Sequence, residues 1–308
     1  MLTRTSRFNR TPARSSENTS PSAAPTEAPA KIELCGSVRA ALAEVGREPN
    51  KALGQHFLAQ PAIARKIASV ANVTGKHTVE IGPGLGALTQ FLLDAQGLWL
   101  IELDHMLANR LQRLLRDFRH VTIVQADALA IDWRKFLRDK APVTVVGNLP
   151  YNVATPLLSS LLEVPDCLER VVAMVQHEVA ERLHAEPRTA SYSALSVLTQ
   201  AVATVRKAFG VAPGAFVPSP KVHSQVVVLE PAPERVAQIA DWNVFRRLVR
   251  TVFRQRRKQL RNSLTQVVTD PAEILRLAGV EPTCRPEELG VDEFCQLANV
   301  IVEYARTS

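Results

Sequence analysis

Four short β-rich runs, spaced by segments long enough for helices, constrain the fold of this chain more than any other feature. They are "HTVEIG", "LWLIELD", "VTIVQAD" and "VTVVGN", and a helical stretch, "PAIARKIASVA", comes before them. Short apolar runs are typical of buried strands, and strands that alternate with helices pair in parallel, because each crossover returns the chain to the same edge of the sheet. The pattern predicts an α/β fold with a doubly wound, Rossmann-like sheet.

The regions on either side of this pattern differ from it in composition. Residues 1–30 are rich in Ser, Thr, Pro and Ala, so they bury too little apolar surface to offset the entropy of ordering, and we expect them to be disordered. After the four runs come "RVVAMVQ", a helical "YSALSVLTQAVA" and two strand candidates, "ATVRKAFGV" and "VHSQVVVLE". The proline-containing "LEPAPER" then has the composition of a linker. We therefore expect a Rossmann-like domain over residues 31–230 and a small all-helical domain over 231–308.

The strongest helix signal, "NVFRRLVRTVFRQRRKQLRNSL", lies in the second of these domains. One face of the predicted helix is apolar and carries Phe245, Leu248, Val249, Val252, Phe253, Leu260 and Leu264. Another face carries Arg246, Arg250, Arg254, Arg257 and Arg261, and no acidic residue lies between Trp242 and Val268. Such a basic face is either a solvated surface or one that contacts phosphates. The net charge of +7 favours nucleic acid as the partner.

The cysteines and the hydropathy indicate in which compartment the chain is expected to work. Cys35, Cys167, Cys284 and Cys295 are scattered without a C-x-x-C pair, which favours neither a disulfide framework nor a zinc site. No apolar run approaches the roughly 18 residues that span a bilayer, and the N-terminus lacks the apolar core of a secretory signal. Its early arginines are also found in organelle transit peptides, but apolar residues at helical spacing are missing there. We expect a cytoplasmic protein with no bound metal and no membrane partner.

A glycine-rich turn follows the first of the four runs, in "VEIGPGLGALT". Gly82, Gly84 and Gly86 let the backbone approach a ligand closely, because no Cβ stands in the way. We expect this turn to open a helix. The spacing G-x-G-x-G differs from the dinucleotide fingerprint G-x-G-x-x-G, so the glycines alone are also compatible with an ordinary tight turn between a strand and a helix.

Three carboxylates near this turn indicate which kind of cofactor it would bind. Glu102 ends the second run, twenty positions after Gly82, where a carboxylate can accept hydrogen bonds from both hydroxyls of a ribose. Asp127 ends the third run, where it could accept from an adenine amino group, and Glu80 lies beside the glycines. An acidic pocket favours a cationic cofactor over a pyrophosphate. The combination indicates S-adenosylmethionine rather than NAD.

The fourth run ends in "GNLPY", at the same edge of the predicted sheet. Asn148 supplies a side-chain oxygen, and the backbone carbonyl of Leu149 or Pro150 supplies a second acceptor. Together they can hold both N–H bonds of an adenine amine and aim its lone pair at a methyl group. Pro150 fixes the loop, and Tyr151 offers a face on which an extruded base can stack. The alternative is structural: a turn cap, a strand end and a core aromatic.

These motifs, in this order, resemble the ribosomal RNA adenine dimethylase family. The resemblance runs from about Lys51 to about Tyr304, and its motifs are "KALGQHFL", "VEIGPGLGALT", "IELD", "QADAL", "GNLPYN", "FVPSPKVHS" and "RRKQLRNSL". It implies a class I S-adenosylmethionine-dependent methyltransferase that adds two methyl groups to N6 of each of two adjacent adenosines, in a hairpin near the 3′ end of small-subunit (16S) rRNA. It also implies that residues 231–308 bind rRNA. We expect a monomer that acts on a partly assembled 30S particle.

The resemblance assigns individual residues as well. The family's cofactor positions match His56, Leu58, Gly82, Glu102, Asp127 and Asn148, to which the local chemistry adds Glu80 and Gly84. Phe216 resembles a second aromatic that closes over the target base, and Lys221 is placed to meet a phosphate. Many family members have Asn where this chain has His56, although an imidazole can still donate one hydrogen bond and accept another. A purely structural role remains open for His56 and Phe216.

Three other functions also remain open. The large-subunit branch of the same family, which confers macrolide resistance, shares N-x-P-Y, but "VFRQRRKQLRNSL" and "GVEPTCRPEELGVDEFCQLANV" resemble the small-subunit branch. A non-catalytic ribosome-assembly factor could retain the fold, and the basic helix suits binding. A NAD-dependent dehydrogenase would need a hydride-transfer site, for which the chain offers no acid–base candidates.

Overall fold

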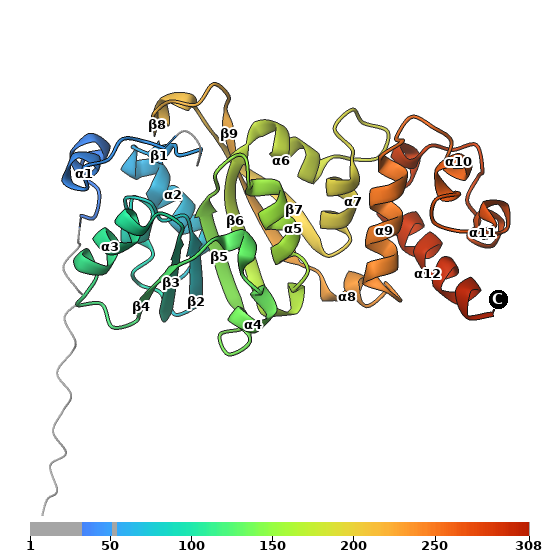
Figure 1. Ribbon diagram of the computed structural model, residues 1–308, viewed down its shortest axis with the longest axis horizontal. Helices are drawn as coiled ribbons and strands as arrows, with labels where there is room; N and C mark the ends of the chain where they lie inside the picture. Colours follow the sequence, from blue (N-terminus) through green and yellow to red (C-terminus); the bar gives the residue numbers. More distant parts are fainter. Residues whose placement is uncertain (1–32, 51–53, 308) are drawn as a thin grey trace, which may run out of the picture. The chain divides into compact units, whose positions relative to one another are not determined.

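A seven-stranded mixed sheet forms the centre of the computed structural model, which describes residues 33–50 and 54–307 (Figure 1). The strand order is β4-β3-β2-β5-β6-β9-β7. The strands from β4 to β6 are parallel, and β9 is antiparallel to both of its neighbours. The bounds are β2 (His77–Ile81), β3 (Gly97–Glu102), β4 (Val121–Gln125), β5 (Val143–Asn148), β6 (Leu168–Gln176), β7 (Ala203–Val211) and β9 (Ser224–Pro231). This order confirms the predicted doubly wound fold and places its switch point between β2 and β5.

The burial of the strands explains why their sequences are so apolar. Every residue of β5 is buried except Asn148 at its end, because helices cover both faces of a parallel sheet. The edge strand β4 is only half-buried, and its side chains are accordingly more mixed. The predicted strands at "ATVRKAFGV" and "VHSQVVVLE" are confirmed as β7 and β9.

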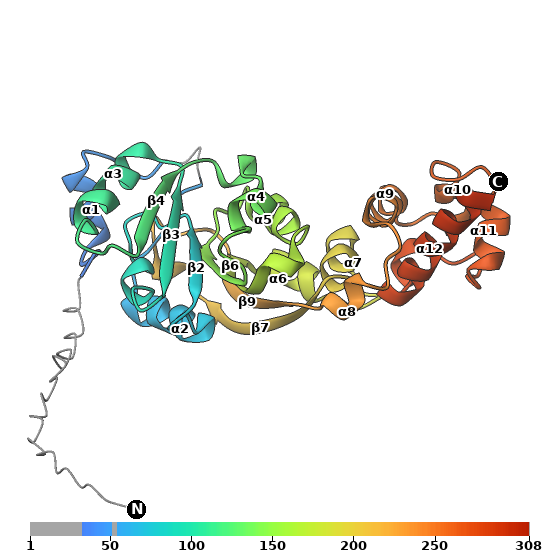
Figure 2. The same cartoon turned by 90° about the horizontal axis from the view of Figure 1, so that it is seen from below.

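Helices flank the sheet on both faces, and Figure 2 shows α2 on one face and α4 and α5 on the other. This part of the chain contains α1 (Val38–Glu44), α2 (Pro61–Ala71), α3 (His105–Leu114), α4 (Trp133–Leu137), α5 (Ala154–Leu161), α6 (His177–His184) and α7 (Ala194–Gln200). The prediction at "PAIARKIASVA" is confirmed, since α2 covers these residues and begins at Pro61, whose fixed φ suits a first helical turn. Among the described residues, no helix is long and apolar enough to cross a membrane.

A two-stranded antiparallel sheet joins two motifs that are far apart in the sequence. β1 (Phe57–Leu58) pairs with β8 (Phe216–Val217), so that Phe57 lies opposite Val217 and Leu58 opposite Phe216. The pairing brings "GQHFL" beside "FVPSPK". The start of "KALGQHFL", at residues 51–53, and the predicted disordered tail at residues 1–30 lie outside the described residues.

The C-terminal helices pack on the same hydrophobic core as the sheet. They are α8 (Pro233–Val236), α9 (Trp242–Phe253), α10 (Leu260–Leu264), α11 (Pro271–Leu277) and α12 (Val291–Thr307). α9 contacts α7 and α12, and it buries Phe245, Leu248, Val249 and Val252, which confirms the apolar face predicted there. The predicted linker "LEPAPER" holds the end of β9 and the start of α8. The domain division at residue 230 stays a prediction.

The long basic helix expected from Asn243 to Leu264 is wrong, because α9 ends at Phe253 and α10 begins at Leu260. The six residues between them include no apolar side chain that could hold another helical turn on the core. Contacts elsewhere replace the helical ones: the N–H of Leu260 donates to the carbonyl of Cys284 at 2.7 Å, and Arg256 turns inward to bond three other groups. Arg254, Arg257 and Arg261 therefore do not share one helix face, although all three are exposed.

Candidate active site

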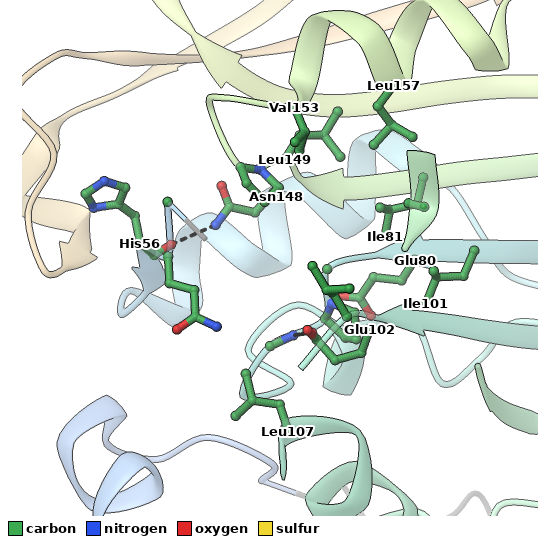
Figure 3. A pocket seen from close by; sticks show the side chains of 18 of the residues that line it. His56, Glu80, Ile81, Ile101, Glu102, Leu107, Asn148, Leu149, Val153 and Leu157 are labelled. Carbon is green, nitrogen blue, oxygen red and sulfur yellow. Dashed lines mark hydrogen bonds between the residues drawn. The ribbon is translucent and has the colours of Figure 1, made fainter. Parts of the chain in front are cut away.

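An open-mouthed cleft lies at the carboxyl ends of β2, β3 and β5 (Figure 3). Its wall is built from the glycine turn, the residues that follow β3 and β4, the "NLPYN" segment after β5, and residues 54–58. Parallel strands end at one edge of a sheet, and a switch point leaves a crevice there. Eleven of the predicted site residues line the cleft: His56, Leu58, Glu80, Gly82, Gly84, Glu102, Asp127, Asn148, Leu149, Pro150 and Tyr151.

The glycine turn forms part of the cleft wall, but no α-helix begins at it. The helix predicted there is therefore wrong. Gly82, Gly84 and Gly86 all have positive φ angles, of 68°, 57° and 84°. A right-handed helix requires negative φ angles. Only a 3-10 turn at Thr89–Phe91 follows before the chain enters β3. A Cβ on Gly84 would lie 3.2 Å from the ring of Phe57, so the close packing of residues 54–58 on the turn depends on glycine.

Glu102 is held rigidly beside the glycine turn. Its Oε2 accepts a hydrogen bond from the N–H of Gly84 at 2.9 Å, and its Oε1 accepts from the N–H of Asp104 at 2.9 Å. The residue is 6% exposed, and burial raises the pKa of its carboxyl above the ordinary value despite these two bonds. Each oxygen keeps a further lone pair for a ligand hydroxyl. The predicted ribose contact therefore has a fixed and accessible acceptor.

Glu80 is the second carboxylate of the cleft and the more deeply buried one. It is 1% exposed, and burial raises the pKa of its carboxyl to about 8. Its Oε2 has no hydrogen-bond partner among the described residues. A buried carboxyl oxygen without a hydrogen bond is costly unless a ligand supplies a positive charge or a donor. Two acidic groups in one apolar cleft thus suit a cationic ligand and disfavour a pyrophosphate.

Two exposed leucines line the cleft beside the strand-end acids. Leu103 directly follows Glu102 and is 50% exposed, and Leu129 lies two residues after Asp127 and is 41% exposed. Large apolar side chains left open in a cleft suit a flat, apolar ring. The sequence prediction missed both leucines, although a large apolar residue within two positions after a strand-end acid is a signal that could have found them. Asp127 itself accepts a hydrogen bond from the N–H of Leu129 at 2.9 Å.

Asn148 is oriented by a backbone carbonyl from the opposite wall. Its Nδ2 donates to the carbonyl oxygen of His56 at 3.0 Å, which leaves Oδ1 without a hydrogen bond among the described residues (Figure 3). The carbonyl of Pro150 already accepts two N–H groups of the first turn of α5, both at 3.0 Å, whereas that of Leu149 accepts none within the described residues. Of the two backbone acceptors that the sequence left open, Leu149 is therefore the one available to a ligand.

Tyr151 presents its ring near this pair of acceptors. Its hydroxyl hydrogen-bonds Ser224 Oγ at 2.7 Å, and burial raises the pKa of the phenol. The ring stacks on the imidazole of His56, with 5.4 Å between centroids and 29° between planes. The imidazole also bonds the carbonyl of Pro218 through Nδ1 at 2.7 Å, and Figure 3 shows it turned away from Glu80 and Glu102. The side chain of His56 thus lies on the Tyr151 side of the cleft.

Phe216 and Lys221 are not among the residues that line the cleft. Phe216 is 3% exposed, because β8 pairs with β1 and turns its ring into the interior. Lys221 is exposed on the loop that follows. Among the described residues, no group of three or more metal-ligating side chains is close enough to hold a metal ion.

Comparisons with known proteins agree with this geometry. The family model for ribosomal RNA adenine dimethylase matches residues 46–303. The chain is 41% identical to the "Ribosomal RNA small subunit methyltransferase A" of Idiomarina loihiensis over 265 residues, which cover 85% of this chain and 91% of that protein. It is 42% identical to the protein of the same name from Acinetobacter baylyi over 261 residues, 84% of this chain and 94% of that protein.

Two solved structures share the fold. A dimethyladenosine transferase from Plasmodium falciparum aligns with a TM-score of 0.70 and 24% identity, over 82% of this chain and 98% of that one. The 23S rRNA methyltransferase ErmE aligns with a TM-score of 0.59 and 25% identity, over 80% and 99%. Strand order, cleft and comparisons together define a Rossmann-like methyltransferase. The chain belongs to the ribosomal RNA adenine dimethylase family, which confirms the predicted family and enzyme class.

Proposed function

We propose that this protein transfers methyl groups from S-adenosylmethionine to N6 of two adjacent adenosines near the 3′ end of small-subunit rRNA, two methyls to each. The observation that carries the proposal is the setting of Asn148. Its Nδ2 is held by the His56 carbonyl, its Oδ1 has no hydrogen bond among the described residues, and it lies in the same cleft as two buried carboxyl groups. The two curated relatives described above are named as small-subunit methyltransferases, which supports this choice of rRNA.

The residues of the cleft fit the proposed cofactor. When bound, S-adenosylmethionine supplies an electrophilic methyl group on a sulfonium. Glu102 would accept from the ribose hydroxyls, the leucines after Glu102 and Asp127 would flank the adenine, and Asp127 would accept from its amino group. Glu80 offers a buried acceptor to the positive end of the cofactor.

The chemistry at the target base rests on two neutral acceptors. The lone pair of an adenine amine is delocalised into the ring, so the nitrogen attacks well only when its two N–H bonds are held out of that conjugation. Asn148 Oδ1 and the carbonyl of Leu149 would accept these two bonds, and the base would stack on Tyr151. No strong base is needed, because the nitrogen loses its proton after it has gained the methyl. After the first transfer one N–H remains, and either acceptor can still hold it.

The exposed basic residues after α9 and at the start of α10 supply a surface for rRNA. Arg254, Arg257, Lys258 and Arg261 are exposed, and no acid lies within this stretch of sequence. Such residues contact phosphates and make binding depend on salt. We propose a monomer that acts on a partly assembled 30S particle in the cytoplasm.

The deciding experiment is tritiated methyl transfer from S-adenosylmethionine to small subunits that lack the modification, with large subunits in parallel and nucleoside analysis of the product. We expect dimethyladenosine in the small-subunit rRNA. Label found only in the large subunit would instead assign the protein to the large-subunit branch of the family, together with the 23S enzyme. Cofactor binding without label in either subunit would indicate an assembly factor that has lost its chemistry.

A further inference from the structure

A buried arginine lies behind the glycine turn, outside the cleft wall. Arg110 on α3 is 6% exposed and donates three hydrogen bonds. Nε donates to Glu44 Oε2 at 2.8 Å, Nη1 to the carbonyl of Leu85 at 3.1 Å and Nη2 to the carbonyl of Leu34 at 2.9 Å. Leu85 stands between two glycines of the turn. One rigid guanidinium thus joins the turn to residues 33–45, which precede the family-matched region.

The packing of residues 33–45 places them directly behind the cleft. α1 lies beside α3 in Figures 1 and 2, and it buries Val38, Ala41 and Leu42 in a cluster with Phe57, Leu85 and Leu107, which line the cleft. A Cβ on Gly86 would approach the Cβ of Leu34 to 3.0 Å. This segment is therefore the back support of the turn, and it touches the turn so closely that only glycine fits.

The helix that carries Arg110 also holds the predicted ribose acceptor. Asp104 caps the start of α3, and its N–H donates to Glu102, whose other oxygen accepts from Gly84. The glycine turn is thus fastened to α3 at two points, through Glu102 at the start of the helix and through Arg110 farther along it. Two attachments fix the orientation of the turn relative to the Glu102 carboxyl group. A single attachment would let the turn rotate.

We propose that Arg110 is a positioning residue for the cofactor: it holds the glycine turn in the shape that receives S-adenosylmethionine, with Glu44 and residues 33–45 as its support. The inference rests on the proposed function, since it requires that the cleft be the cofactor site. Arg113 offers a matched comparison. It pairs with the same Glu44 carboxylate from the surface, where it is 60% exposed, and makes no bond to the turn.

The test compares Arg110→Ala, Arg110→Lys and Arg113→Ala in the full-length protein. Calorimetry would give the Kd for S-adenosylmethionine, and steady-state kinetics the KM for the cofactor and for small subunits. We expect Arg110→Ala to raise the cofactor Kd and KM about 10- to 100-fold, because hydrogen bonds from a charged group are lost. The KM for small subunits should change less than about twofold, and Arg113→Ala should leave both values within about twofold. Arg110→Lys should be intermediate, since an ammonium lacks the planar fork that spans three acceptors.

A second variant tests the proposal in case Arg110→Ala does not fold. Glu44 is 41% exposed, and Glu44→Gln removes the charge opposite Arg110 without opening the interior. We expect it to raise the cofactor Kd about three- to tenfold. Wild-type cofactor affinity in folded Arg110→Ala, or in Glu44→Gln if that variant alone folds, would overturn the proposal. A wild-type protein that binds no S-adenosylmethionine would overturn the proposed function, and this inference with it.

Discussion

The cleft and the basic segment 254–261 both depend on ionisable residues, but the structure holds them in opposite ways. In the cleft, Glu80 and Glu102 are buried, and backbone N–H groups fix the position of Glu102. In the basic segment, Arg254, Arg257, Lys258 and Arg261 are exposed. Ionised or polar groups act strongly in an apolar cleft, whereas water and salt weaken charges on a surface. The cleft is therefore suited to chemistry and the basic segment to attraction of an anionic partner.

Arg256 shows that residue type alone does not determine whether a basic side chain is exposed or bonded to the rest of the fold. It lies beside Arg257 in the same basic run, yet its guanidinium donates to the carbonyls of Thr189 and Ala190 at 2.9 and 2.7 Å and pairs with Glu287. Arg256 thus ties the loop before α7 to the segment before α12. Two neighbouring arginines have different tasks, and only the three-dimensional contacts distinguish them.

The largest effect is expected in the cleft, from Asn148→Ala. Loss of an acceptor that acts on the reacting nitrogen should lower kcat by about 100- to 1,000-fold. RNA affinity should change little, since Asn148 lies inside the cleft and away from the basic surface. Single-turnover methylation and filter binding would separate the two quantities. Asn109→Ala, on the exposed face of α3, is the control, and an equal loss of affinity and rate would remove the assigned role from Asn148.

The basic segment should show the reverse pattern. Reversal of charge at Arg254, Arg257 and Arg261 together should weaken binding to small subunits by roughly 100-fold at 0.1 M salt and reduce the slope of log K against log salt by about 2 to 3. The cofactor Kd should not change. A salt titration of binding checks both expectations. Unaltered binding would mean that the segment is a solvated surface with no RNA contact.

A comparison of single variants at Arg256 and Arg257 would sharpen the contrast within that segment. Arg256→Ala should lower Tm by about 3 to 6 °C, because it removes hydrogen bonds that join two parts of the fold. Arg257→Ala should leave Tm unchanged and weaken RNA binding by about three- to fivefold, as expected for one phosphate contact. Differential scanning fluorimetry and filter binding give the two readouts. If both variants lost only RNA affinity, the inward contacts of Arg256 would be unimportant in solution.

The smallest effect is a pH dependence of stability that arises from Glu80. Burial raises its pKa to about 8 in the folded protein, from an ordinary value of 4.5. The neutral form thus stabilises the fold fully below pH 4.5, and this contribution is lost as the pH rises through 8. We expect the Tm of wild type relative to Glu80→Gln to fall by at least about 3 °C between pH 5 and pH 8.5. Parallel Tm curves for the two proteins would show that the carboxyl is not buried as described.

Local patterns were sufficient for the sheet and for most of the cleft. Each predicted strand is a short apolar run, and each predicted acid or amide comes where its run ends, so parallel pairing alone brings Glu102, Asp127 and Asn148 to one edge. Predictions that depended on contacts between distant segments fared less well. No helix begins at the glycine turn, because the positive φ angles of its three glycines exclude one there. The orientation of His56 could not be predicted, since it depends on Pro218, 162 residues away.

The doubly wound class of the sheet, the family and the carboxyl groups and amide of the cleft follow from the sequence by itself, because period and position along a strand are local properties. Tertiary structure alone decided which arginine turns inward, which carbonyl beside Asn148 accepts no bond from the described residues, and that Arg110 fastens the glycine turn to residues 33–45. Hydrogen bonds and close packing act over a few ångströms between segments far apart in the chain. Their partners are therefore set only once the whole fold has formed.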